Sequence, residues 1–76
     1  PFNPTTNISF TIPATSNVSL KVFNILGREV ATLVNETKSA GNYSIIFNAS
    51  GLSSGVYLYQ LTTDNFTSTK KFTLMK

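Results

Sequence analysis

The segment 20–34, LKVFNILGREVATLV, constrains the fold most, because two strand-like runs flank four residues that favour a turn. Asn24 is preferred at the first position of a type I turn, where its side chain can bond the backbone ahead of it. Gly27, at the fourth position, tolerates the positive φ through which the chain re-enters a strand by a bulge. The segment therefore predicts a β-hairpin closed by the turn Asn24–Gly27, with Arg28 and Glu29 opening the return strand.

The two central residues of this turn, Ile25 and Leu26, are apolar, whereas exposed turns are normally polar. We expect these side chains either to cover the end of a core or to contact another surface. The hairpin carries no residues that suggest chemistry, so it is interpreted as an organiser of the fold.

A chain of 76 residues supports one domain at most, and we expect a single domain over residues 1–76. The absence of Cys removes disulfides and thiolate metal sites, and the absence of His removes the usual general base. Stability must then come from a dense apolar core, which six Phe, three Tyr and the aliphatic residues can supply. Nothing in the composition calls for a cofactor or a metal.

The polar residues are mainly Thr, Ser and Asn, and only nine residues are charged. Thr, Tyr, Phe, Ile and Val favour strands, and such a low-charge composition suits an extracellular bacterial module. No apolar run approaches the roughly 18 residues of a membrane span. The chain begins at Pro1 without an initiator Met or a signal peptide, so we expect it to be a piece of a longer protein.

Alternation of apolar and polar residues predicts most of the strands. Their expected inner faces are Ile8, Phe10 and Ile12; Val18, Leu20 and Val22; Tyr43, Ile45 and Phe47; and Phe72 and Leu74. Residues 28–34 alternate poorly, which indicates burial on both faces or a bulge. Residues 56–61 are apolar on both faces, which predicts a central strand.

Residues rich in Pro, Gly and Asn separate these strands. We expect an extended start at residues 1–4, a break at 13–17 and a polar loop at 35–41. The loop 48–55 is expected to be tied to the core by Leu52, and Asp64-Asn65 to form a hairpin turn in left-handed geometry. Six strands at this spacing predict an all-β, antiparallel β-sandwich.

Four motifs, in this order and spacing, resemble those of the type A C-terminal sorting domains of proteins exported by the bacterial type IX secretion system. They are Pro1–Thr6, Leu20–Val30, Gly55–Tyr57 and Lys70–Lys76, and the resemblance covers essentially the whole chain. Asn24 stands where the family often carries Asp, and it serves the same turn.

The resemblance implies an immunoglobulin-like sandwich of six to seven strands, a fold also similar to that of flagellar hook-cap domains. It implies a sorting address that follows a passenger protein and is read by an outer-membrane translocon. A surface sortase then removes the domain and joins the passenger to a lipopolysaccharide anchor, so the location is secreted or at the cell surface. The implied recognition residues are Gly27, Arg28, Gly55, Tyr57, Lys70, Lys71, Phe72, Leu74 and Lys76.

The basic residues have alternative interpretations. Lys70, Lys71 and Lys76 can form part of a signal or can simply deter edge-to-edge strand pairing. A net charge of +3 without a dense basic stripe disfavours nucleic acid as a partner. Without the resemblance, a surface ion pair with Glu29 or Glu36 is the better interpretation of Arg28.

Three function classes stay open: a sorting module, an assembly domain that self-associates or binds a partner through a strand edge, and a carbohydrate-binding module. A sugar platform would use Tyr57 and Tyr59, although core tyrosines with hydroxyls at the rim are favoured. The three carboxylates, those of Glu29, Glu36 and Asp64, lie on separate segments, which argues against acid/base catalysis. The leading hypothesis is a non-enzymatic sorting module.

Overall fold

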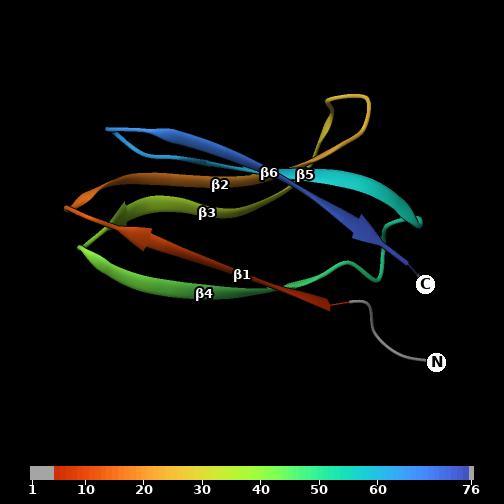
Figure 1. The fold of residues 1–76 in the computed structure, drawn as a ribbon, viewed down its shortest axis with the longest axis horizontal. Helices are drawn as coiled ribbons and strands as arrows, with labels where there is room; N and C mark the ends of the chain where they lie inside the picture. The colour runs from red at the N-terminus through yellow and green to blue at the C-terminus, as the bar shows by residue number, and fades with distance from the viewer. Residues whose placement is uncertain (1–4, 76) are drawn as a thin grey trace.

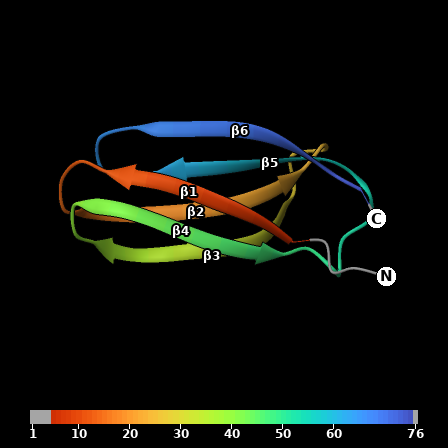
Figure 2. The ribbon, with the colours of Figure 1, turned by 60° about the horizontal axis from the view of Figure 1, so that its bottom comes forward.

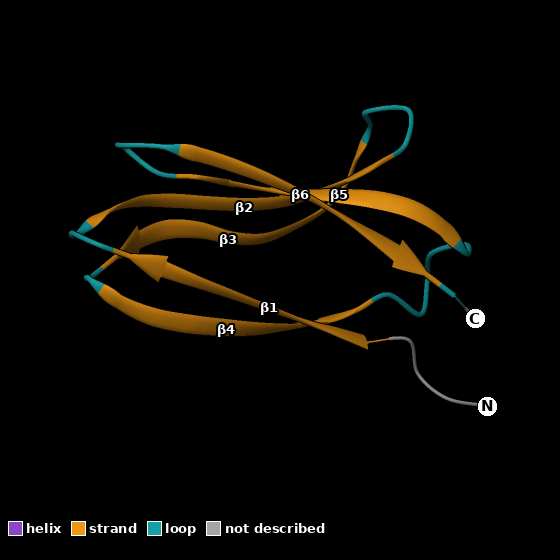
Figure 3. Cartoon of the chain, viewed as in Figure 1, coloured by secondary structure: helices purple, strands orange, loops and turns teal. Residues whose placement is uncertain are grey.

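The computed structural model describes residues 5–75, which form six strands joined by loops, with no helix among them (Figure 3). The strands are β1 (Thr5–Ile12), β2 (Ser16–Asn24), β3 (Glu29–Lys38), β4 (Gly41–Asn48), β5 (Gly55–Thr62) and β6 (Thr67–Leu74). The predictions for Pro1–Pro4 and for Lys76 lie outside the described residues. The all-β class is confirmed.

The strands form two antiparallel sheets that face each other (Figure 1). One sheet pairs β1 with β4, and the other has the order β3-β2-β5-β6. Seen from the side of the narrow sheet, β1 and β4 lie in front of the middle of the wide sheet (Figure 2). The edge strand β6 extends past the narrow sheet on the side of β1. The predicted β-sandwich is therefore confirmed, with sheets of unequal width.

The core lies between the two sheets, as the alternation predicts. Val18, Leu20 and Val22 on β2 are almost fully buried, and Ile8 and Ile12 face them from β1. Complete burial of one such side chain stabilises the fold by about 1.5–3 kcal/mol. Because β2 pairs on both sides, its inner face forms the centre of the core.

The predicted turn is present between β2 and β3. Gly27 has a φ of 85°, and its N–H donates to the Asn24 carbonyl at 2.9 Å. The Asn24 side-chain oxygen accepts from the N–H groups of Leu26 and Arg28, both at 3.0 Å. Ile25 and Leu26 are 72% and 79% exposed, so the expectation that they cover a core is wrong. The reason is that the hairpin projects outward, on the side of the wide sheet away from β1 and β4 (Figure 1).

The predicted loop at residues 35–41 is wrong for most of its length, because β3 continues to Lys38. The strand β2 begins as early as Ser16, and its backbone supplies pairing partners for the polar residues of β3, ending with Ser16 opposite Lys38. Lys38 lies over the Tyr43 ring at 4.7 Å and pairs with Glu36 at 3.2 Å. The predicted irregularity of β3 is confirmed by two register shifts against β2.

The remaining predictions concern the second half of the chain. The strand β5 is central, between β2 and β6, and Leu52 packs against the core, both as predicted. Asp64 and Asn65 lie in the β5–β6 hairpin turn, but the predicted left-handed geometry is wrong, since no non-glycine residue among 5–75 has a positive φ. Instead, the Thr63 hydroxyl accepts hydrogen bonds from the N–H groups of Asn65 and Phe66, both at 3.2 Å.

Candidate functional site

Three of the four sequence motifs meet at one end of the wide sheet. Asn24, at the start of the β2–β3 turn, lies opposite Tyr57 of β5, and Tyr57 lies opposite Phe72 of β6. Two pairs further along, Gly55 faces Leu74. We call this region, formed by residues 23–28, 55–58 and 71–74, the motif end. Three segments that are far apart in sequence therefore lie side by side, and they contribute to the same surface and to the same part of the core.

Aromatic rings hold the inner side of the motif end together. The Phe72 ring stacks on Tyr57 with centroids 5.8 Å apart, and Phe47 of β4 meets it edge-on at 6.5 Å. Phe47 in turn pairs with Thr6 of β1, so the described part of the opening motif also reaches this end. Such aromatic contacts contribute about 0.5–1.5 kcal/mol each beyond area burial. The predicted inward orientation of Phe72 and Leu74 is confirmed, since Phe72 packs on the core and Leu74 is part of it.

Tyr57 is a core residue rather than part of a sugar platform. Its side chain is only 7% exposed, and its hydroxyl donates to the Ser53 carbonyl at 2.7 Å. Tyr59, two residues further along the strand, shares the inner face and packs against the core. The carbohydrate-platform interpretation is wrong because both rings face the opposite sheet.

The two described lysines of the terminal motif lie on opposite faces of β6. Lys71 pairs with Leu58 and shares the outer face with it, whereas Lys70 pairs with Tyr59 on the inner face. Both side chains are exposed. Lys70 stays accessible because it lines a groove of about 180 Å³ between β1 and β6. At this groove the narrow sheet does not cover the wide sheet. The fold therefore separates two neighbouring charges that the motif places side by side.

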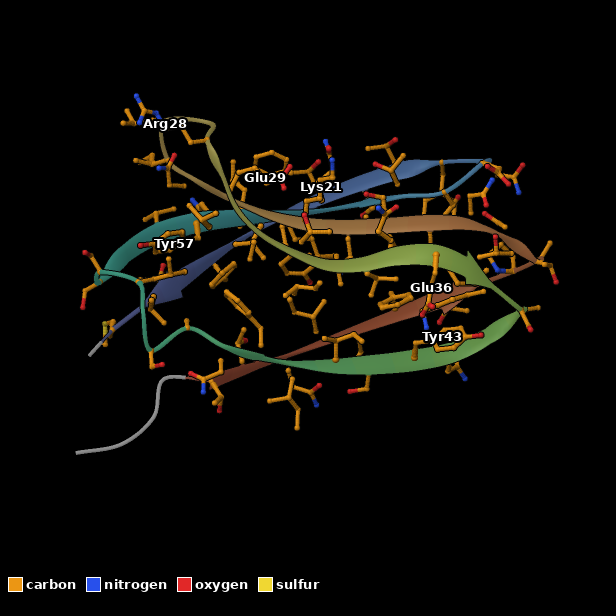
Figure 4. All side chains as sticks on the ribbon, turned by 180° about the vertical axis from the view of Figure 1, so that it is seen from behind. Lys21, Arg28, Glu29, Glu36, Tyr43 and Tyr57 are labelled. Carbon is orange, nitrogen blue, oxygen red and sulfur yellow. The ribbon has the colours of Figure 1, made fainter. Side chains whose placement is uncertain are left out.

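Arg28 is exposed on the projecting turn, at one extremity of the molecule (Figure 4). The expected ion pair with Glu29 or Glu36 is wrong, because each carboxylate has a nearer partner. Glu29 pairs with Lys21 of the adjacent strand at 3.4 Å, and Glu36 pairs with Lys38 on its own strand. Within residues 5–75, Arg28 makes no salt bridge.

The three carboxylates lie in separate structural contacts. The Thr32 hydroxyl donates to Glu29 at 2.7 Å, and this bond, with a smaller contribution from the Lys21 charge, holds the pKa of Glu29 below its ordinary value of 4.5. Asp64 accepts hydrogen bonds from Asn17 at the far end of β2. No group of three acidic side chains lies together within residues 5–75.

Two features of the structure were not predicted from sequence. One is the contact between Asp64 and Asn17. The other is an apolar area on the outer face of the wide sheet, where Phe23 pairs with Leu58. The sequence gives one indication of this area, the alternation of the strands. Phe23 falls on the face opposite to the buried residues of β2, and the run 56–61 is apolar on both faces.

The described residues include no helix that is long and apolar enough to cross a membrane. Searches among curated proteins and among solved structures found no match. A comparison with protein-family models matches residues 1–75 to the secretion system C-terminal sorting domain. The match spans nearly the whole chain, and the all-strand architecture agrees with the fold expected for these domains. The chain therefore belongs to the family of C-terminal sorting domains of the type IX secretion system.

Proposed function

We propose that this domain is a non-catalytic address that directs an upstream passenger protein across the outer membrane to the cell surface. Family membership supports a role in sorting for export and recognition by the secretion machinery. The proposal adds the finer steps: the translocon reads the folded domain, and a sortase then acts at the junction with the passenger. Residues 1–76 act together in this proposal as one domain.

The observation that carries the proposal is the convergence of the motifs at the motif end. The turn at Asn24–Arg28, the start of β5 and the end of β6 are distant in sequence but hydrogen-bonded neighbours in the sheet. Their inner side chains build the core, and their outer ones, Arg28 and Lys71 among them, face solvent. A receptor can therefore read one composite surface only when the domain is folded.

The test is a secreted reporter fused to residues 1–76 in a bacterium with a type IX system, with surface reporter measured against total reporter. The parent fusion should reach the surface, and deletion of residues 72–76 should abolish delivery. Changing both Lys71 and Lys76 to Gln should impair delivery while leaving the thermal melt of the purified domain unchanged, because an exposed charge such as that of Lys71 contributes little to folding.

The outcomes separate the parts of this proposal. A parent fusion that stays inside the cell would reject the sorting function. Normal delivery after deletion of residues 72–76 would reject the role of β6 in the signal. Normal delivery of the double Gln variant would remove only the lysines from the proposed recognition residues.

The second candidate is an assembly domain that associates through a strand edge. Among the described strands, β6 is one of four that pair on one side only, with β1, β3 and β4, and the groove between β1 and β6 adjoins its edge. Concentration-dependent self-association of the purified domain in sedimentation velocity, together with failure of the parent fusion to reach the surface, would favour this candidate.

A further inference from the structure

Apolar side chains gather on the outer face of the wide sheet at the motif end. Phe23 points outward because its neighbour Val22 points into the core, and its cross-strand partner Leu58 shares that face. Val56, two residues before Leu58 on the same strand, lies on the same side. These three side chains are half-buried, yet none of them packs against the core.

The projecting turn extends this area. Ile25 and Leu26 are 72% and 79% exposed, and only Asn24 separates them from Phe23 in the chain. We call the set Phe23, Ile25, Leu26, Val56 and Leu58 the apolar tip. A group of large apolar side chains that gathers on an outer surface, outside the core, usually marks an interaction site.

The tip is pre-ordered. The Asn24 side chain accepts two backbone hydrogen bonds across the turn, and the Asn24 N–H donates to the Arg28 carbonyl at 2.9 Å. Gly27 supplies the positive φ that completes the turn. A rigid projecting ridge loses little conformational entropy on binding, and its shape fits a pocket better than a flat surface.

The net charge around the tip is positive. Arg28 lies two residues after Leu26 in the chain, and Lys71 lies opposite Leu58 across the strand pair. Lys21 and Glu29 neutralise each other nearby. The other two carboxylates, those of Glu36 and Asp64, lie toward the opposite end of the sheet, where they contact residues near the start of β2 or the end of β3. An anionic rim on the binding partner is therefore complementary to the tip.

We propose that the apolar tip inserts into an apolar, carboxylate-rimmed pocket on an outer-membrane protein of the export machinery. This inference rests on the proposed sorting function and names the surface that is read. A protein pocket is a better partner for the tip than a lipid surface, because a single short apolar group anchors a protein only marginally in a membrane. A turn of fixed shape, by contrast, can match the shape of a pocket.

The test compares three reporter fusions: the parent, the double variant Ile25→Ser/Leu26→Ser, and Ile46→Ser. Ile46 is the matched control, since it is 75% exposed but lies on β4, in the other sheet. Surface delivery of the double variant should fall at least tenfold, and that of Ile46→Ser should stay within twofold of the parent. All three purified domains should melt within a few degrees of one another.

A photo-reactive amino acid at position 26 or at position 46 identifies the occupant. The proposal requires that position 26, unlike position 46, cross-links in the exporting cell to an outer-membrane protein of the machinery, identified by mass spectrometry. A second double variant, Arg28→Glu/Lys71→Glu, should lower delivery at least fivefold and weaken the same cross-link.

Three results would overturn the inference while leaving the sorting function intact. They are parent-level delivery of the Ile25→Ser/Leu26→Ser variant, cross-linking of position 26 only to lipid, and cross-linking only to a second copy of the domain. A parent fusion that is not delivered would instead reject the proposed function on which the inference rests.

Discussion

The carboxylate of Asp64 accepts two hydrogen bonds from Asn17, one from the backbone N–H at 3.1 Å and one from the side-chain amide at 3.4 Å. A third hydrogen bond joins the same two segments: the Asp64 N–H donates to the Ser16 hydroxyl at 3.1 Å. The contact joins the start of β2 to the β5–β6 turn, so it fastens the end of the wide sheet opposite the motif end.

The first prediction concerns this contact. Asp64→Ala should lower the free energy of unfolding by about 1 kcal/mol, because hydrogen bonds to a charged group are worth more than neutral ones but this group is exposed. Urea unfolding of the purified domain measures the change. Asn65→Ala, in the same turn, is the control and should stay within about 0.5 kcal/mol of the parent. Equal stability of the two variants would show that the contact contributes nothing.

The second prediction concerns the β2–β3 turn. Gly27→Val should destabilise the domain by about 1–2 kcal/mol or more, since a β-branched residue is strained at a φ of 85°. The matched control is Gly51→Val, because a Cβ at either position meets open space but only Gly27 has the positive φ. Thermal melts distinguish the two, and an unchanged melting temperature for Gly27→Val would contradict the role assigned to this glycine.

The third prediction separates folding from recognition on β6. Phe72→Ala should lower stability by about 2 kcal/mol, below the roughly 3–5 kcal/mol of fully buried aromatic truncations because the ring is half-buried. Lys71→Gln should change stability by less than about 0.5 kcal/mol. Denaturant unfolding of the two purified variants tests this. A larger loss for Lys71→Gln than for Phe72→Ala would reverse the assignment of these neighbours.

The fourth prediction concerns pH. Because folding lowers the pKa of Glu29, the unfolded chain binds its proton more readily than the folded one. The stabilisation is present above the unfolded value near 4.5 and is lost as the pH falls through the lower folded pKa. Melting temperatures of the parent and of Glu29→Gln, measured from pH 7 to pH 3, should therefore converge at the acidic end. A constant difference over this range would contradict the role of the Thr32 and Lys21 contacts.

The fifth prediction is that the purified domain turns over no ester, peptide or glycoside substrate, because its carboxylates lie apart in separate contacts. The measurement is a panel of chromogenic substrates with the parent and with Glu29→Gln, Glu36→Gln and Asp64→Asn. Turnover that survives purification controls and disappears in one of these variants would overturn the prediction.

Local patterns predicted most of the strands and the key turn. The inner faces of β1, β2 and β4 follow from alternation alone, since consecutive side chains of a strand point to opposite sides. The turn at Asn24–Gly27 follows from two residues whose local chemistry requires it, an amide that bonds the backbone ahead and a glycine with positive φ. These features depend on residues within a few positions of each other.

The boundary of β3 shows where local patterns stop being sufficient. Residues 35–38 are polar, so taken alone they favour a loop, but β2 supplies backbone partners from Ser16 to Ser19. The same limit applies to Asp64, whose partner Asn17 is 47 residues away. Pairing at this distance depends on the register and order of the whole sheet, which no short window of sequence contains.

The sequence by itself determined the class of the fold, the organising hairpin and, through four spaced motifs, the family. Tertiary structure alone decided that these motifs meet at one end, that Lys70 stays exposed on the inner face beside the groove between β1 and β6, and that Phe23, Leu58 and the turn form one outer apolar tip. The physical reason is that strand periodicity assigns a side chain to one of two faces, whereas sheet order and pairing between distant strands decide which residues share that face and whether the other sheet covers it.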